Sequence, residues 1–135
     1  MSRLWLDANV LLRFLTRDPP LQAAQAARLM AKAEAGELRL YVAPLVLAEV
    51  VWVLKSFYGH SVPAIRDVLV PLVGAPGIEV DQLSRIVEAL ELAASRNVDF
   101  LDAVLAVEAA AAGETVCTFD AKDFKRLPAT WLSPD

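Results

Sequence analysis

Four acidic residues stand where the surrounding sequence gives a carboxylate little local purpose, and they are the residues of this chain best suited to chemistry. They occupy four separate segments: Asp7, Glu49, Asp102 and Asp120. Like charges held a few ångströms apart cannot all stay ionised unless a cation neutralises them. Carboxylate oxygens are the ligands that hard divalent cations prefer. If the fold gathers these four side chains, we expect a divalent-cation site.

Three of the four also have an ordinary structural explanation when each is taken alone. Asp7 ends a strand-like run and could cap the helix that follows it. Asp102 stands three residues after Asp99 and could belong to a helix cap that Asp99 begins. Asp120 starts a sequence that suits a turn or a helix start equally well. For these residues both interpretations stay open.

Glu49 is harder to explain structurally. The segment from Pro44 to Leu54 contains no other charge, and the neighbours of Glu49 at helical spacing are apolar. A helix that is apolar all round is expected to be buried, and a buried, unpaired carboxylate is costly. Lys55 or an arginine could compensate the charge, and a metal site would do so at least as well.

Length and charge set the bounds on function. The 135 residues, 56% of them hydrophobic, predict a single packed domain over residues 1–135. The net charge is −4, which argues against nucleic acid, but setting the four acids aside brings it to 0, so charge does not decide the partner. The single cysteine, Cys117, excludes an intrachain disulfide and a zinc cage of thiolates, and its apolar strand pattern predicts a small core residue.

Apolar runs are too short for a membrane span, and the N-terminus lacks a signal-peptide pattern, so we expect a cytoplasmic protein with no membrane partner. Hydrophobic periodicity predicts strands at residues 3–6, 38–42, 78–80 and 114–119, and helices at 10–15, 21–35, 44–58, 63–73, 82–95 and 100–112, with Asp81 and Asp99 as N-caps. This alternation favours an α/β fold with a central parallel sheet of four to five short strands and helices on both faces. Asp7 and Asp120 then lie at carboxyl ends of strands, where such sheets carry their sites.

Several common kinds of catalytic site, among them those that cut RNA through its 2′-hydroxyl, lack their residues in this sequence. Cleavage through the 2′-hydroxyl usually needs paired acids and bases, most often histidines, and His60 is the only histidine. No Gly-rich phosphate loop or Ser-His-Asp set is present either.

The motifs together resemble the PIN-domain family, specifically VapC-type toxins of toxin–antitoxin pairs. The matching segments span essentially the whole chain: Leu6-Asp7-Ala8-Asn9-Val10-Leu11-Leu12, Pro44-Leu45-Val46-Leu47-Ala48-Glu49-Val50, Phe100-Leu101-Asp102-Ala103 and Thr118-Phe119-Asp120-Ala121-Lys122-Asp123-Phe124. The resemblance implies a PIN-like three-layer sandwich and a metal-dependent endoribonuclease. In such an enzyme the four acids hold one or two Mg²⁺ or Mn²⁺ ions, and an activated water cuts the phosphodiester to leave a 5′-phosphate and a 3′-hydroxyl.

The resemblance also suggests supporting roles. Asn9 would orient Asp7 or a ligand water, and the Thr118 hydroxyl would hydrogen-bond the acid cluster. We assign Asp120 as a direct ligand and Asp123 as a supporting or water-mediated one, because a place in the first helical turn gives Asp123 a sufficient structural role. Basic residues near the acids are candidates for substrate binding: Arg13, Arg17, Lys122, Lys125 and Arg126.

Partners follow from the same resemblance. We expect a VapB-like antitoxin that places an amphipathic segment in the groove between the first helices, with a basic side chain in the acidic pocket. We also expect a homodimer, because Leu69, Val70 and Val73 exceed what one core face needs. The alternatives are a noncatalytic PIN-fold RNA-binding module, which would have lost an acid, and a receiver-like signalling domain, whose phosphoacceptor pattern is missing here.

Overall fold

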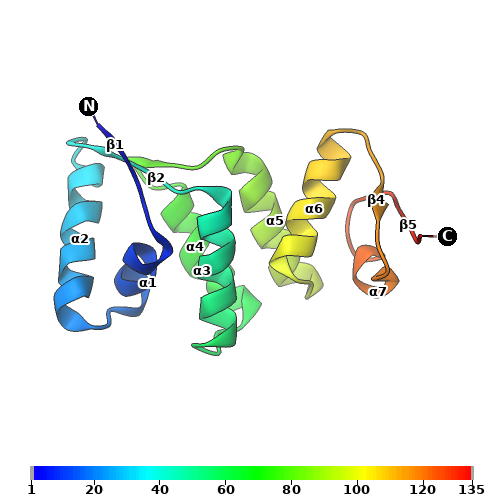
Figure 1. Cartoon of the computed structure of the whole chain (residues 1–135), viewed down its shortest axis with the longest axis horizontal. Coiled ribbons are helices and arrows are strands. Elements are labelled where there is room, and N and C mark those ends of the chain that lie inside the picture. The colour runs from blue at the N-terminus through cyan, green and yellow to red at the C-terminus, as the bar shows by residue number, and fades with distance from the viewer. Residues whose placement is uncertain (1, 135) are drawn as a thin grey trace. The chain divides into compact units, whose positions relative to one another are not determined.

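The computed structural model describes residues 2–134 and divides into two compact units, one ending at Leu83 and one beginning at Ser84 (Figure 1). Each unit is described on its own. The first contains β1 (Arg3–Trp5), α1 (Ala8–Thr16), α2 (Pro20–Glu34), β2 (Arg39–Tyr41), α3 (Pro44–Ser56), α4 (Val62–Val73) and β3 (Ile78–Glu79). From the boundary onward follow α5 (Leu83–Arg96), α6 (Phe100–Ala111), β4 (Val116–Cys117), α7 (Ala121–Phe124) and β5 (Trp131–Leu132).

All strand pairs are parallel, which confirms the predicted α/β class. In the first unit β2 is the central strand, with Leu40 opposite Leu4 of β1 and Ile78 of β3. In the second unit Val116 of β4 pairs with Trp131 of β5. The strands therefore form sheets of three and two, where the sequence predicted one sheet of four to five. Strand β5 was not predicted, because two residues are too few to show an alternating pattern.

Local signals in the sequence set most helix boundaries. Proline at the first helical position begins α2 and α3, where its missing N–H costs no hydrogen bond. Ser61 caps α4 by accepting a hydrogen bond from the Ala64 N–H. Asp99 caps α6 as predicted, and accepts from the Leu101 N–H at 3.3 Å. Asp81 was wrongly predicted to cap α5: the helix begins at Leu83, and the Asp81 carboxylate instead accepts the Tyr41 hydroxyl at 2.8 Å.

Gly77 lets α2 approach the start of β3. Its φ is +80°, a region that only glycine enters readily, and a Cβ at this position would overlap the backbone of Ala33 in α2. The Gly77 carbonyl accepts a hydrogen bond from the Leu40 N–H at 2.8 Å, directly beside the β2–β3 pair. The absence of a side chain here is therefore a requirement of helix–sheet packing.

Burial differs from the sequence-based predictions at several positions. Leu69 and Val73 lie in the core of the first unit, at 0% and 1% exposure, and Val70 is half-buried. The prediction that these three residues form an exposed apolar surface for a homodimer is therefore wrong. Cys117 is exposed, because β4 is short and turns its side chain away from the buried Val116. Both segments are apolar in sequence, but an apolar residue in such a segment can face either the core or the solvent.

The core of the first unit forms where α1 packs against α2 and α3, around Leu11, Leu40 and Leu47. The second unit is built around Leu90, Ala103 and Phe124, from three different helices. None of the helices in the described part of the chain is long and apolar enough to cross a membrane.

Candidate metal centre

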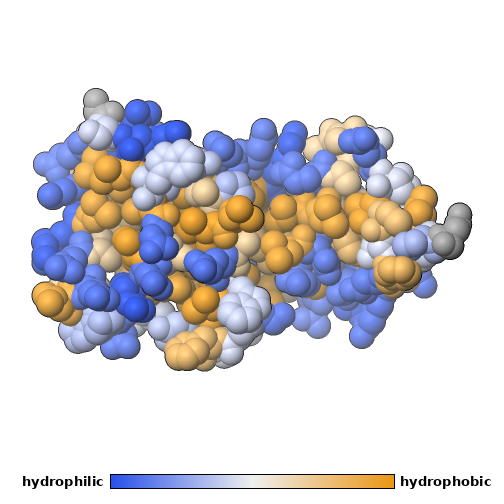
Figure 2. All heavy atoms as spheres, viewed as in Figure 1, coloured by the Kyte–Doolittle hydropathy of each residue, from blue (hydrophilic) through white to orange (hydrophobic). Residues whose placement is uncertain are grey.

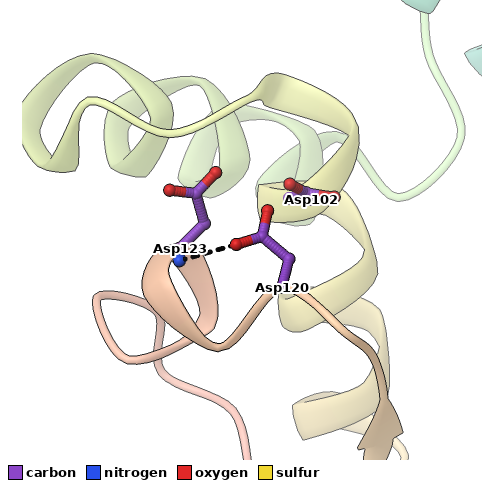
Figure 3. Close-up of side chains that lie close together, drawn as sticks. All are labelled: Asp102, Asp120 and Asp123. Atoms are coloured by element: carbon purple, nitrogen blue, oxygen red, sulfur yellow. Dashed lines mark hydrogen bonds between the residues drawn. The ribbon is translucent and has the colours of Figure 1, made fainter. Parts of the chain in front are cut away.

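Three aspartates of the second unit form the acid cluster of this chain. Asp102, Asp120 and Asp123 each offer a carboxylate oxygen, and these oxygens all lie within 4.8 Å of one another. Figure 3 shows the Asp120 and Asp123 side chains directed from α7 toward Asp102 on α6. The structure thus brings together residues up to 21 positions apart in the sequence, including two of the four acids first singled out.

Asp102 lies in the first turn of α6 and is half-buried. Burial raises the pKa of its carboxyl above the ordinary value, and the nearby charges of Asp99, Asp120 and Asp123 raise it further. The sequence predicted only a capping role for Asp99, but its charge also acts on Asp102, three residues further along the chain. Asp99 is the contributor that the sequence reasoning missed, and this spacing was the available signal.

Asp120 and Asp123 are held in place by hydrogen bonds at the start of α7. Asp120 is the N-cap residue, and its Oδ1 accepts the Asp123 backbone N–H at 3.1 Å. The Asp120 N–H in turn donates to the hydroxyl oxygen of Thr118 at 2.9 Å. Thr118 therefore acts on the cluster by fixing the backbone of Asp120.

Asp123 was predicted to be a supporting or water-mediated ligand because a capping role was expected of it, and the structure gives that role to another residue. The capping role expected of Asp123 belongs to Asp120, which uses one carboxylate oxygen for the cap. Asp123 contributes its backbone N–H to that cap and keeps its carboxylate available to the cluster. Asp123 is also the less exposed of the two side chains.

Asp7 and Glu49 belong to the first unit, which the structure defines independently of the second. Asp7 precedes α1 as its N-cap residue, but its side chain makes no capping hydrogen bond, so the ordinary explanation for an aspartate here does not apply. Asn9 follows it, exposed in the first turn of the helix. The carboxylate of Asp7 is exposed and has no hydrogen-bonding duty within the described unit.

The expectation that Glu49 is buried is wrong. The side chains of Leu47, Val50 and Leu54 form the buried face of α3, whereas Glu49 lies on the opposite, exposed face. Leu45 and Trp52 on that face are 85% and 65% exposed, and Figure 2 shows hydrophobic side chains at the surface over α3. The desolvation argument for a metal at Glu49 therefore fails, because apolar neighbours in the sequence do not ensure burial.

The basic residues predicted to bind substrate occupy two places. Arg13 lines a groove of about 300 Å³ between α1 and α2 together with Asn9, and its Nε donates to Gln22 at 2.9 Å. Arg17 follows α1 as its C-cap, with φ of 59°. In the second unit Lys122, Lys125 and Arg126 are exposed basic side chains in and just after α7.

The acid cluster fits a hard divalent cation by the chemistry of its donors. All three side chains are carboxylates, so the ligand atoms are oxygens, which suits Mg²⁺ or Mn²⁺ better than zinc or copper. Burial and, after it, repulsion from neighbouring acids raise the pKa of Asp102, and a bound cation would stabilise its ionised form. Asp102, Asp120 and Asp123 would hold the ion, with Thr118 fixing the position of Asp120.

Comparison with known proteins gives a family. A search of curated proteins finds no match. One similar solved structure is described as "Crystal structure of VapBC2 from Rickettsia felis bound to a DNA fragment from their promoter", with 20% identity, full coverage of both chains and a TM-score of 0.39. The family model described as "PIN domain" matches residues 4–129, which cover most of both units and include every acid discussed above. By this match over nearly its whole length, the chain belongs to the PIN-domain family.

Proposed function

We propose that this protein is a metal-dependent endoribonuclease of the VapC type. The observation that carries the proposal is the cluster of Asp102, Asp120 and Asp123 in a chain of the PIN-domain family. A divalent cation supplies such a site with an acidified water and with positive charge for the leaving 3′-oxygen. The expected products carry a 5′-phosphate and a 3′-hydroxyl.

The chain's own residues then have distinct tasks. Asp102, Asp120 and Asp123 supply the negative charge that draws the cation, and the Thr118 hydroxyl keeps the Asp120 backbone in place. We propose that Asp7 and Glu49 are metal ligands as well, because both carboxylates stand in PIN-like motifs. The exposed position of each leaves its oxygens available.

The test is cleavage of single-stranded RNA by the purified protein in the presence of Mg²⁺ or Mn²⁺, followed by analysis of the product ends. Cleavage should stop when EDTA is added, and Asp102→Asn should abolish it. Glu114→Gln is the matched control, because it removes an exposed acid of the same unit that lies outside the cluster. Cleavage that survives EDTA or Asp102→Asn would overturn the proposal.

The alternative is a noncatalytic PIN-fold module that binds RNA without cutting it. The cleavage assay distinguishes it from the enzyme, because such a module would bind RNA and leave it uncut in the presence of Mg²⁺ or Mn²⁺. The acid cluster favours the enzyme, because a binding module has no use for three repelling carboxylates on its surface.

We further propose a VapB-like antitoxin as partner. The groove between α1 and α2 is lined mostly by apolar surface, with Val10, Ala26 and Leu29 among its residues and Arg13 at its wall. An amphipathic helix could bury its apolar face there. Such an inhibitor, and a cytoplasmic RNA target, follow from the resemblance of the motifs to toxin–antitoxin proteins.

A homodimer remains part of the proposal, although Leu69 and Val73 are buried and do not supply its interface. Sedimentation at micromolar concentration is the direct measurement. A single species of 14.7 kDa would count against a dimer.

A further inference from the structure

In the second unit two arginine side chains each donate a hydrogen bond to the backbone carbonyl of the other arginine. Nη1 of Arg96 donates to the carbonyl oxygen of Arg126 at 3.1 Å, and Nη1 of Arg126 donates to the carbonyl oxygen of Arg96 at 3.4 Å. The residues are 30 positions apart, Arg96 at the end of α5 and Arg126 just after α7. Both are exposed.

Neither arginine donates to a carboxylate anywhere in the described part of the chain. By contrast, Arg85 of the same unit pairs with Glu108 at 2.9 Å. A guanidinium has five N–H donors, and the reciprocal contact accounts for one donor of each arginine. Capping the last carbonyl of α5 explains one hydrogen bond of Arg126, but leaves most of the donors of both side chains unused.

The pair also lies next to the acid cluster along the chain. The Arg126 N–H donates to the Asp123 carbonyl at 3.0 Å, so one turn of backbone separates that arginine from an acid of the cluster. Arg96 stands three residues before Asp99, whose charge acts on Asp102. Each side chain reaches the backbone of the other residue, so both positive charges belong to one local part of the surface, and an anion bound there would be attracted to both.

We propose that Arg96 and Arg126 form one binding site for a phosphate of the RNA backbone, adjacent to the phosphate that is cut. This inference rests on the proposed ribonuclease function and names a substrate contact for it. The planar fork of arginine matches phosphate oxygens in a way that a point charge does not. The second unit carries nine acidic and five basic residues, so RNA approaching it needs a local positive contact.

The experiment measures binding of a short single-stranded RNA by fluorescence anisotropy in EDTA, where cleavage does not interfere. Salt is varied between about 50 and 200 mM, because the logarithm of affinity falls with the logarithm of salt by about 0.7 per phosphate neutralised on a single strand. We expect Arg96→Gln to reduce this slope by about 0.7, and Arg126→Gln to reduce it equally. The double variant should lose little more, because the two side chains serve one phosphate.

Control variants separate charge from folding. Arg28→Gln removes an exposed arginine of α2 and should leave the slope unchanged. Arg126→Lys keeps the charge and should keep the slope, which also shows that position 126 tolerates substitution. A single-stranded DNA of the same sequence should lose the same slope as RNA, since the contact is to phosphate.

Several results would overturn the site. They are a slope that is unchanged in Arg96→Gln and Arg126→Gln, losses that simply add in the double variant, or no measurable RNA binding by the unaltered protein. Failure of the ribonuclease proposal is distinguishable. A protein with the arginine-dependent slope that never cuts RNA with Mg²⁺ or Mn²⁺ would retain the phosphate site and lose the catalytic function.

Discussion

The two units treat charge in opposite ways. The first carries eight acidic and eight basic residues, whereas the second has nine acidic and five basic, so the whole net charge of −4 lies in the second. In the first unit Glu79 of β3 pairs with both Arg3 and Arg39, and the Arg3 guanidinium lies 4.6 Å from the centre of the Tyr41 ring. In the second unit three aspartates gather without a basic partner in the cluster.

The charges around Glu79 stabilise a sheet, whereas the clustered aspartates of the second unit repel one another and do not stabilise the fold. Paired surface charges add modestly to stability, and the network around Glu79 ties three strands to one another. A cluster of like charges reduces stability, and such a cost typically marks a functional site. The comparison predicts where substitutions should stabilise the protein and where they should disable it.

The largest expected effect concerns Asp7 of the first unit. We expect Asp7→Asn to lower RNA cleavage by more than about 100-fold, because removal of a ligand charge should exceed the 10- to 100-fold cost typical of an outer group. The measurement is the cleavage rate in Mn²⁺, with Glu37→Gln as the exposed control in the first unit. Cleavage by Asp7→Asn at the parent rate would confine the ligands to the second unit.

The next effect concerns metal affinity within the second unit. Calorimetric titration of Mn²⁺ should show at least about a 10-fold loss for both Asp120→Asn and Asp123→Asn. Asparagine at position 120 can still accept the Asp123 N–H, so the cap is preserved. Asp99→Asn is the control, because Asp99 acts on Asp102 by charge but lies outside the cluster. A larger loss in the control than in either variant would remove the cluster as the metal site.

A smaller effect should appear in stability without metal. Asp102→Asn is expected to raise the melting temperature in EDTA by a few degrees, because it removes a charge that burial and three neighbouring acids disfavour. Asp7→Asn should raise it less, since no other acid of the first unit joins it in a cluster within the described residues. A lower melting temperature for Asp102→Asn would show that its carboxylate stabilises the fold.

The pH dependence of this difference has a definite sign. The folded protein raises the pKa of Asp102, so it holds the proton more tightly than the unfolded chain does. Ionised Asp102 therefore lowers stability above the raised pKa, and that loss is relieved as pH falls toward the ordinary value of 3.8. The melting temperatures of the parent and Asp102→Asn in EDTA should thus converge as pH is lowered. Divergence toward acid pH would contradict the shift.

The smallest effect tests the exposed face of α3. Trp52→Gln should change the free energy of unfolding by no more than about 0.5 kcal/mol, as is usual for an exposed side chain. Leu47→Ala on the buried face of the same helix should cost about 2–5 kcal/mol. Denaturant unfolding measures both. A loss near the second value for Trp52→Gln would show that another surface covers this face in solution.

Sequence reasoning was most successful where the cause is local. The cap by Asp99, the proline that begins α3, and the helix ends follow from backbone chemistry within a few residues. It failed where the outcome depends on distant packing. The composition around Glu49 gave an apolar helix, but could not say which face would be covered. The contact between Arg96 and Arg126 has no sequence signal, because it joins carbonyls and side chains 30 positions apart.

Because α7 is only four residues long, the concentration of the metal ion should affect how well this segment is ordered. A helix of four residues cannot persist without outside support, and the hydrogen bond from the Asp123 N–H to Asp120 is part of what holds it. An ion bound by the carboxylates of both Asp120 and Asp123 would stabilise the same turn in addition to this hydrogen bond. Opening of this segment should then become rarer as the ion is added, so the Asp123 amide would exchange its hydrogen with solvent more slowly. The carboxylates of the cluster would be fully arranged only once the ion had bound.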